Sequence, residues 1–293
     1  MKPPGKPHNG KGTKMIVDFH THVFPPEVLK KRDDFVSREP AFSLIYGDPK
    51  ARMVTIEGHL EAMDLDGVNL AVICGFPWAD PGLAETANAY LLDAQNKFPE
   101  TVYAFYTPPL SVAESVVLSA RDALQKGMKG IGEVAFYTDQ MDGDDWSHLG
   151  RLAEVAMDFD VPLLLHVNES VGHIYPGKVD MRIRDVWRFA SQFPDLTLVL
   201  AHWGGGLFFY ELMKSVGRSV GKLYYDTAAS PFLYAQSIYR IAVDILGPER
   251  ILFGSDYPLI KPSRYFREMD ASGLTPKEKS MILGENARSL LKN

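Results

Sequence analysis

The chain has 293 residues, of which 46% are hydrophobic and 23% are charged, and its net charge is -6 at pH 7. These values are ordinary for a globular protein with a large core, and they exclude a basic nucleic-acid-binding protein or a protein held on anionic membranes as the main class. A single cysteine, Cys74, excludes an internal disulfide framework. The single cysteine and the lack of an apolar run of about 20 residues predict a cytoplasmic protein. We expect its partner to be a small molecule, and neither nucleic acid nor a membrane. Assembly into a homo-oligomer stays open.

Residues 1–14 are dominated by lysine, proline and glycine and predict a flexible tail. From residue 15 to 293, short apolar runs alternate with amphipathic stretches, without a linker or a strong shift in composition. Strict alternation of strands and helices favours a parallel sheet, and eightfold β/α barrels commonly run ~250 residues as one domain. We therefore predict an α/β fold, a single (β/α)8 TIM barrel over 15–293.

The expected strands begin at 15–17 and continue at 68–74, 102–106, 130–134, 162–166, 196–202, 223–225 and 251–253. The expected helices cover 56–65, 83–98, 112–126, 146–159, 181–193, 207–216 and 234–246, with closing helices after 262. Between the first strand and the first helix, residues 24–54 are too long for an ordinary connection. We interpret them as an irregular insertion and a candidate lid.

The first strand ends in the sequence Asp18-Phe19-His20-Thr21-His22. Side chains two residues apart on a strand share a face, so Asp18, His20 and His22 are expected to point the same way. Two imidazoles on one rigid segment are preorganised to bind one divalent ion. The alternative is a pair of histidines in a surface turn.

Four later apolar runs end in Glu133, His166, His202 and Asp256. In a β/α barrel all carboxyl ends of the strands meet at one rim, where active sites are built. Four of the chain's eight histidines, His20, His22, His166 and His202, fall at the expected ends of strands. Histidines that are merely satisfied within a core would not be expected to gather there. The alternative for His166 alone is a histidine satisfied within the core.

These segments, together with Trp203-Gly204-Gly205-Gly206 after His202 and Phe253-Gly254-Ser255-Asp256-Tyr257-Pro258, resemble the amidohydrolase superfamily. The most similar branch is the amidohydrolase-related one that includes aminocarboxymuconate semialdehyde decarboxylase. The resemblance implies that His20, His22, His166 and Asp256 hold one divalent metal. It also implies that His202 polarises or deprotonates a water molecule beside that metal.

Glu133 leaves the number of metals open. In the similar TatD-like nuclease branch a glutamate on the fourth strand bridges two metals, so Glu133 and His202 are also candidate ligands. The alternative is a Glu133 that is ion-paired with a lysine or an arginine across the barrel. Histidine and carboxylate ligands without cysteine suit zinc, manganese or iron, and zinc is the default expectation.

Substrate-binding candidates follow other strand ends. Aromatic side chains could line a pocket, although such residues also pack in cores and lids. Polar side chains after His166 lie in the loop 168–178. This loop either determines substrate specificity or is an ordinary solvent-exposed loop. The five candidates are Trp78, Tyr137, Glu169, His173 and Trp203. Three basic residues are candidates for binding a substrate carboxylate, and the alternative is that each is an ordinary solvent-exposed side chain: Arg52, Lys261 and Arg264. The glycines at 204–206 are interpreted as backbone clearance, not as a nucleotide site.

The predicted activity is that of a metal-dependent hydrolase that attacks an amide, lactone or ester with metal-activated water. Asp256 would shuttle the proton, with His202 as its catalytic partner and Asp18 as an acceptor for a ligand histidine. Two alternatives stay open. One is a non-oxidative decarboxylase or hydratase acting on an unsaturated or aromatic carboxylic acid, and the other is a barrel that binds metal and ligand without turnover.

Overall fold

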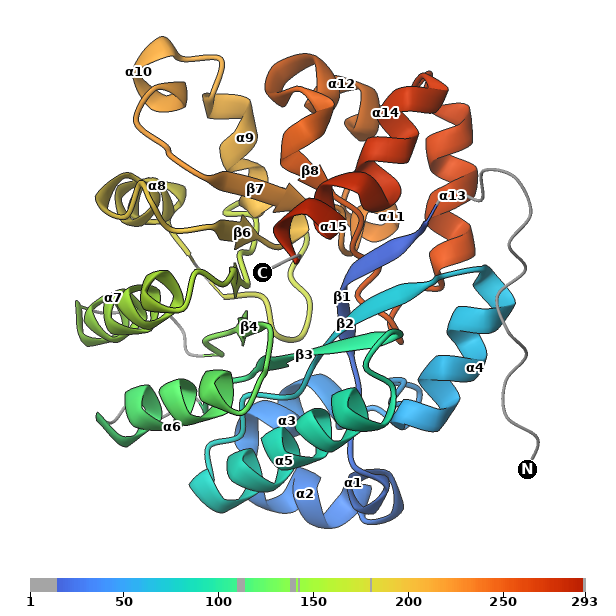
Figure 1. The fold of residues 1–293 in the computed structure, drawn as a ribbon, viewed down its shortest axis with the longest axis vertical. Coiled ribbons are helices and arrows are strands. Elements are labelled where there is room, and N and C mark those ends of the chain that lie inside the picture. The colour runs from blue at the N-terminus through green and yellow to red at the C-terminus, as the bar shows by residue number, and fades with distance from the viewer. Residues whose placement is uncertain (1–14, 110–113, 138–140, 142, 180, 292–293) are drawn as a thin grey trace.

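The computed structural model describes residues 15–109, 114–137, 141, 143–179 and 181–291. The expected tail, 1–14, lies outside this part of the chain. Eight parallel strands form one sheet in sequence order (Figure 1). They are β1 (Val17–His22), β2 (Leu70–Cys74), β3 (Val102–Tyr106), β4 (Gly130–Val134), β5 (Leu163–Leu165), β6 (Leu198–Leu200), β7 (Leu223–Asp226) and β8 (Ile251–Leu252).

The sheet closes between β1 and the segment that contains and follows β8. The Phe19 amide donates to Phe253 O at 2.7 Å, and the Asp256 amide donates to His20 O at 2.9 Å. The His22 amide donates to Tyr257 O at 2.7 Å. This closure confirms the predicted (β/α)8 barrel and places the segment after β8 beside the histidines of β1.

Helices surround the strands, as Figure 1 shows. Those that follow β1 to β5 are α4 (Ile56–Asp66), α5 (Pro81–Lys97), α6 (Glu114–Gln125), α7 (Gly143–Asp158) and α8 (Ile183–Gln192). The later ones are α9 (Leu207–Tyr210), α10 (Lys214–Gly217), α11 (Ser230–Leu233), α12 (Ile238–Leu246), α13 (Pro262–Ala271), α14 (Pro276–Ser280) and α15 (Asn286–Leu290). No described helix combines the length and the apolar character needed to cross a membrane.

Two expectations about local structure were wrong. The insertion after β1 is not irregular, because it forms α1 (Pro26–Lys30), α2 (Arg32–Arg38) and α3 (Pro40–Tyr46), which lie together in Figure 1. Its helices share a small apolar core of their own around Phe42 and Trp78. The helix expected over 207–216 is instead broken into α9 and α10.

The main core has two layers. Inside the barrel, alternate strand residues such as Phe19, Val72 and Leu164 form one apolar cluster, which Ala287 of α15 helps to close. A second, larger cluster fills the space between the strands and the surrounding helices. Because both faces of the sheet are buried, the strand ends are held rigidly, which is the condition for a preorganised site at the rim.

Candidate metal centre

Six predicted ligands lie together at the carboxyl ends of the strands. His20 and His22 stand on β1 and Glu133 on β4. Three more residues lie in the segments just after β5, β6 and β8: His166, His202 and Asp256. Their side chains form two groups of three, one made of His20, His22 and Asp256 and the other of Glu133, His166 and His202. Residues far apart in the chain therefore converge because parallel strands end at one rim.

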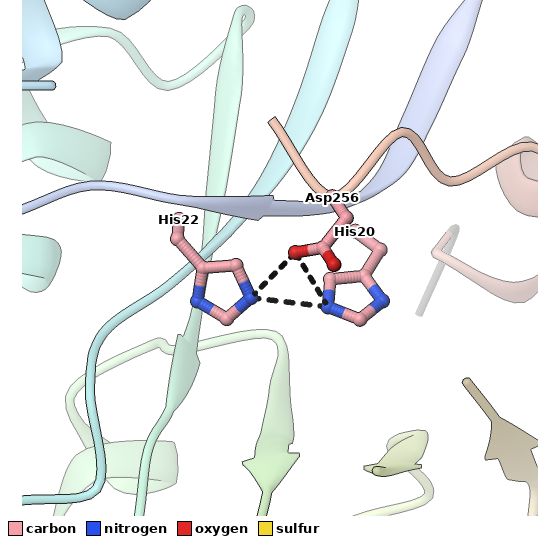
Figure 2. Close-up of side chains that lie close together, drawn as sticks. All are labelled: His20, His22 and Asp256. Atoms are coloured by element: carbon pink, nitrogen blue, oxygen red, sulfur yellow. Dashed lines mark hydrogen bonds and ion pairs between the residues drawn. The ribbon is translucent and has the colours of Figure 1, made fainter. Parts of the chain in front are cut away.

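The first group is shown in Figure 2, where the two imidazoles and the carboxylate face one point. The Nε2 atoms of His20 and His22 are 3.1 Å apart. Asp256 Oδ1 lies 3.4 Å from His22 Nε2 and 3.9 Å from His20 Nε2. His20 is fully buried, whereas 13% of the His22 side chain and 17% of the Asp256 side chain are exposed, so the group opens on the side of those two residues.

Glu133 joins the second group to the first. Its Oε1 lies 2.9 Å from His166 Nδ1, 3.6 Å from His202 Nε2 and 3.5 Å from His20 Nε2. Its Oε2 lies 3.6 Å from His22 Nε2. Among the described residues no lysine or arginine forms an ion pair with Glu133. The alternative of a Glu133 paired with a basic residue across the barrel was therefore wrong for this part of the chain.

Three of the histidines are held by acceptors at their second nitrogen. His20 Nδ1 lies 2.7 Å from Asp226 Oδ2, His22 Nδ1 lies 3.0 Å from Gly75 O, and His202 Nδ1 lies 3.2 Å from Ala228 O. A carboxylate and two carbonyls can only accept, so each Nδ1 carries a proton. When such a ring is otherwise unprotonated, it presents the lone pair of Nε2 to the centre, as a metal ligand requires.

Asp226 was missed in the sequence, and Asp18 was expected in its place. Asp226 Oδ1 also accepts from the amides of His202 and Ala228, both at 2.9 Å, so one carboxylate orients two ligand segments. Asp18 instead accepts from the amide and hydroxyl of Ser255 and from the His20 amide, and its hydrogen bonds within the described residues include none from a histidine ring. The available signal was the apolar run Leu223-Tyr224-Tyr225, which ends in Asp226 like the other ligand strands.

The electrostatics of the centre favour a positive charge. Burial by itself lowers the pKa of His20, but Glu133 and Asp226 outweigh it and hold that pKa well above its usual range. Burial also lowers the pKa of His202, and Glu133 and Asp256 reverse this effect and raise it to about 8. Burial lowers the pKa of His22. The buried carboxylates thus create a field that a proton or a cation can neutralise.

The donor set fits a divalent metal ion. Two Nε2 lone pairs facing each other at 3.1 Å repel unless a cation or a proton lies between them. His166 Nε2 is buried and has no hydrogen-bond partner among the described residues. Imidazole and carboxylate without thiolate are ligands for zinc, manganese or iron. Whether the two groups hold one ion or two stays a prediction.

The backbone around the centre adopts conformations that residues other than glycine rarely adopt. His202 has φ of 55° and Asp256 has φ of 56°, and such left-handed positions cluster at functional sites. At Gly205, φ is 60° and an added Cβ would lie 2.3 Å from Asn168 O. At Gly254 it would lie 2.8 Å from His20 Cβ. Both glycines therefore give the backbone clearance beside the ligands.

Two of the aromatic substrate-binding candidates were wrong because they belong to the core. Trp78 is 1% exposed and stacks on Phe42 of the insertion with ring centroids 4.9 Å apart. Trp203 is fully buried and donates its indole N–H to Ser230 Oγ at 2.6 Å. Neither side chain has surface to offer a substrate.

Tyr137 does lie beside the centre. Its ring centroid is 6.0 Å from that of His166 and 5.8 Å from that of Phe76, on which it stacks. Burial and the charges of Glu133 and Asp256 raise the pKa of Tyr137, and they also raise that of Tyr46 on α3. Tyr46 was missed, and nothing in the sequence of the insertion distinguishes it from its aromatic neighbours.

The polar candidates of the loop after β5 lie farther out. Glu169 pairs with Lys178 at 3.1 Å and accepts from the Tyr175 hydroxyl at 3.1 Å. His173 is exposed, and only its carbonyl has a described contact, with Lys178. Their roles in substrate binding stay predictions.

The basic candidates occupy different surroundings. Arg264 donates to Pro231 O and lies over the ring of Phe232, so its guanidinium is already engaged. Lys261 is exposed at the start of α13. Arg52 is exposed in an open hollow of about 460 Å³, whose lining includes Tyr257, the residue after Asp256.

Comparisons with known proteins agree with this architecture. The model of the family described as Amidohydrolase matches residues 17–292. No curated protein matches the chain by sequence. The chain is similar in fold to 5-carboxyvanillate decarboxylase from Sphingomonas paucimobilis, with 15% identity, a TM-score of 0.74 and coverage of 96% of this chain and 99% of the other.

Two further solved structures have the same fold. For 2,6-dihydroxybenzoate decarboxylase from Rhizobium the identity is 18%, the TM-score 0.66 and the coverage 96% of this chain and 99% of the other. The structure of dihydroxybenzoic acid decarboxylase from Polaromonas was solved with manganese and the inhibitor 2-nitroresorcinol. Its identity to this chain is 17% and the TM-score is 0.69, with coverage of 96% of this chain and 97% of the other. With the family match over almost its whole length and the ligand-bearing strand ends in place, the chain belongs to the amidohydrolase family.

Proposed function

We propose that this protein is a metal-dependent, non-oxidative decarboxylase of an aromatic carboxylic acid. The observation that carries the proposal is the centre in which His20 Nε2 and His22 Nε2 face each other at 3.1 Å beside Asp256, with each Nδ1 committed to an acceptor. That arrangement is built for a divalent cation. Three aromatic-acid decarboxylases of similar fold support decarboxylation over the hydrolysis expected from the sequence.

His20, His22 and Asp256 would hold one ion, and Glu133, His166 and His202 either complete its surroundings or hold a second. A bound divalent ion supplies Lewis-acid chemistry, which holds and polarises oxygen atoms of the substrate. Manganese is the proposed metal, since structures of decarboxylases with this fold contain it, and zinc is the alternative.

Asp256 is the proposed proton donor because it is the partly exposed carboxylate of the centre. Its carboxyl proton goes to the ring carbon that bears the substrate carboxylate. The bond between that carbon and the carboxylate breaks, its electron pair stays with the ring, and CO2 leaves. Asp256 is left ionised and regains its proton from solvent, so the proton balance of each turnover closes.

The test is metal analysis of the purified protein, followed by reconstitution with manganese or zinc and a substrate panel. The panel contains 2,6-dihydroxybenzoate and 5-carboxyvanillate, with release of CO2 as the readout, and a set of lactones, esters and amides. We expect about one to two ions per chain and CO2 release. Turnover of lactones or amides with no CO2 from any aromatic acid would restore the hydrolase alternative, and a metal-free active enzyme would refute the site.

A matched pair of histidine variants locates the metal. His20→Ala removes a buried Nε2 donor and should strongly lower occupancy. His173→Ala removes an exposed histidine of the rim loop and should leave occupancy unchanged. Equal occupancy in both variants would move the metal away from β1.

A further inference from the structure

The insertion after β1 brings an aromatic surface to the metal centre. The Tyr46 ring packs edge-on against Phe76 with centroids 5.8 Å apart, and Phe76 stacks on Tyr137 at 5.8 Å with an interplanar angle of 8°. Tyr137 in turn lies 6.0 Å from the ring of His166. These three aromatic side chains, Tyr46, Phe76 and Tyr137, form what we call the aromatic wall.

The aromatic wall is held in place from behind. Arg32 donates to Tyr46 O from Nε at 2.8 Å and from Nη2 at 2.5 Å, and to Ala51 O at 3.1 Å. One guanidinium therefore fixes the end of α3 and the turn that follows it. The Tyr46 ring also contacts Phe24 at 5.1 Å and Phe42 at 4.9 Å. A ring packed on several sides loses little further conformational entropy when it binds a ligand.

The loop after β5 meets the aromatic wall through a glycine. At Gly177, φ is 84° and an added Cβ would lie 2.3 Å from Ile45 Cδ1 and 3.5 Å from Tyr137 Cε1. The positive φ favours glycine at this position, and the loop backbone passes close to the side chains of Ile45 and Tyr137. The loop expected to carry substrate specificity thus supports the wall through its backbone.

The two phenol groups of the wall are free donors. Neither the Tyr46 nor the Tyr137 hydroxyl has a hydrogen-bond partner among the described residues. Two fully buried tyrosines do have partners: Tyr225 donates to Glu211 at 2.6 Å and Tyr265 to Ser255 O at 2.7 Å. Both tyrosines are half-buried, so a ligand can reach their hydroxyl groups, and two donors without a protein partner beside the candidate metal centre indicate a site for ligand oxygen atoms.

We propose that Tyr46 and Tyr137 select the substrate by donating hydrogen bonds to oxygen substituents on its aromatic ring, while Tyr137, held by its stack on the buried Phe76, packs against that ring. The inference rests on the proposed decarboxylase function and narrows its substrate. Two donors on one wall match an aromatic acid that carries a hydroxyl beside its carboxylate. A ring without such oxygens would leave both donors unpaired, which costs affinity.

The experiment compares binding of two probes to the manganese-loaded protein by calorimetry. One probe is 2-nitroresorcinol, which carries ring hydroxyls, and the other is nitrobenzene, which has none. Tyr46→Phe and Tyr137→Phe keep the rings and remove only the hydroxyls. Each should weaken 2-nitroresorcinol binding about three- to tenfold, the loss expected for one neutral hydrogen bond, and leave nitrobenzene binding unchanged.

The matched control is Tyr103→Phe. Tyr103 stands near the start of β3, at the end of the barrel away from the site, and its ring faces Lys129. This variant should bind both probes like the wild type. Metal content and Tm are measured for all variants.

Two results would overturn the inference. Either wild-type affinity for 2-nitroresorcinol in both wall variants, or an equal loss for both probes, would assign the tyrosines to packing alone. Failure of the proposed function is distinguishable. In that case the wild type releases no CO2 from aromatic acids, yet its preference for 2-nitroresorcinol still depends on Tyr46 and Tyr137.

Discussion

Asp226→Asn tests how the centre is oriented. In the wild type Asp226 Oδ2 accepts the Nδ1 proton of His20 at 2.7 Å, while Oδ1 accepts from two backbone amides at 2.9 Å. An asparagine can keep its oxygen on the two amides, but its NH2 group then faces the Nδ1 proton of His20. The conflict is relieved only if His20 moves its proton to Nε2, which removes the lone pair that binds metal.

The expected magnitude follows from that hydrogen bond. A hydrogen bond to a charged group contributes about 1.5–3 kcal/mol, and about 1.4 kcal/mol corresponds to a tenfold change in affinity. Asp226→Asn should therefore weaken manganese binding by roughly 10- to 100-fold, the range typical for loss of such orienting partners. His202 adds to the loss if the shared carboxylate also shifts, because Asp226 accepts from the His202 amide.

Metal titration by calorimetry measures the effect, and Asp18→Asn is the matched control. Asp18 is equally buried on β1, but it accepts from the amide and hydroxyl of Ser255 and, at 3.4 Å, from the backbone amide of His20, not from an imidazole ring. Burial raises the pKa of Asp18 to about 7 despite these hydrogen bonds, so a neutral amide is a close substitute. Asp18→Asn should keep near-native metal affinity. Native affinity in Asp226→Asn, or equal losses in both variants, would refute the reasoning.

Four further predictions concern Glu133, Asp256 and His202 of the candidate centre and the buried His59 of α4. Glu133→Gln should remove one metal equivalent and most activity if Glu133 bridges two ions, and elemental analysis that finds full occupancy would contradict the bridge. Asp256→Asn should keep part of the metal but lose about a hundredfold or more in turnover, since general acid–base catalysis supplies ~10²–10⁴. If the site holds one metal ion, His202→Asn should lose turnover as Asp256→Asn does; if the site holds two ions, His202→Asn should also lose metal. Near-native turnover in Asp256→Asn would assign the proton transfer to another group. Burial lowers the pKa of His59 to about 4, so below pH 6.5 the unfolded chain binds a proton that the folded protein excludes. Stability should fall by on the order of 3 kcal/mol between pH 6.5 and 4, and His59→Gln should flatten that slope in urea unfolding.

The sequence by itself determined the barrel and most of the candidate metal centre. Eight apolar runs alternating with helices leave few other arrangements, and the parallel order then brings all strand ends to one rim. His20, His22, Glu133, His166 and Asp256 could be identified for that reason, since each lies near or just beyond the carboxyl end of a strand. Their convergence depends on topology and not on fine packing.

Only the tertiary structure decided how these side chains are oriented and what surrounds them. Asp226, not Asp18, accepts the hydrogen bond from His20 Nδ1, because the choice between two buried carboxylates depends on distances across the barrel. Trp78 and Trp203 enter the core, while Tyr46 reaches the site from an insertion whose helices the sequence did not indicate. Aromatic residues have the same local pattern in a core and in a pocket, and packing between distant segments decides which of the two they occupy.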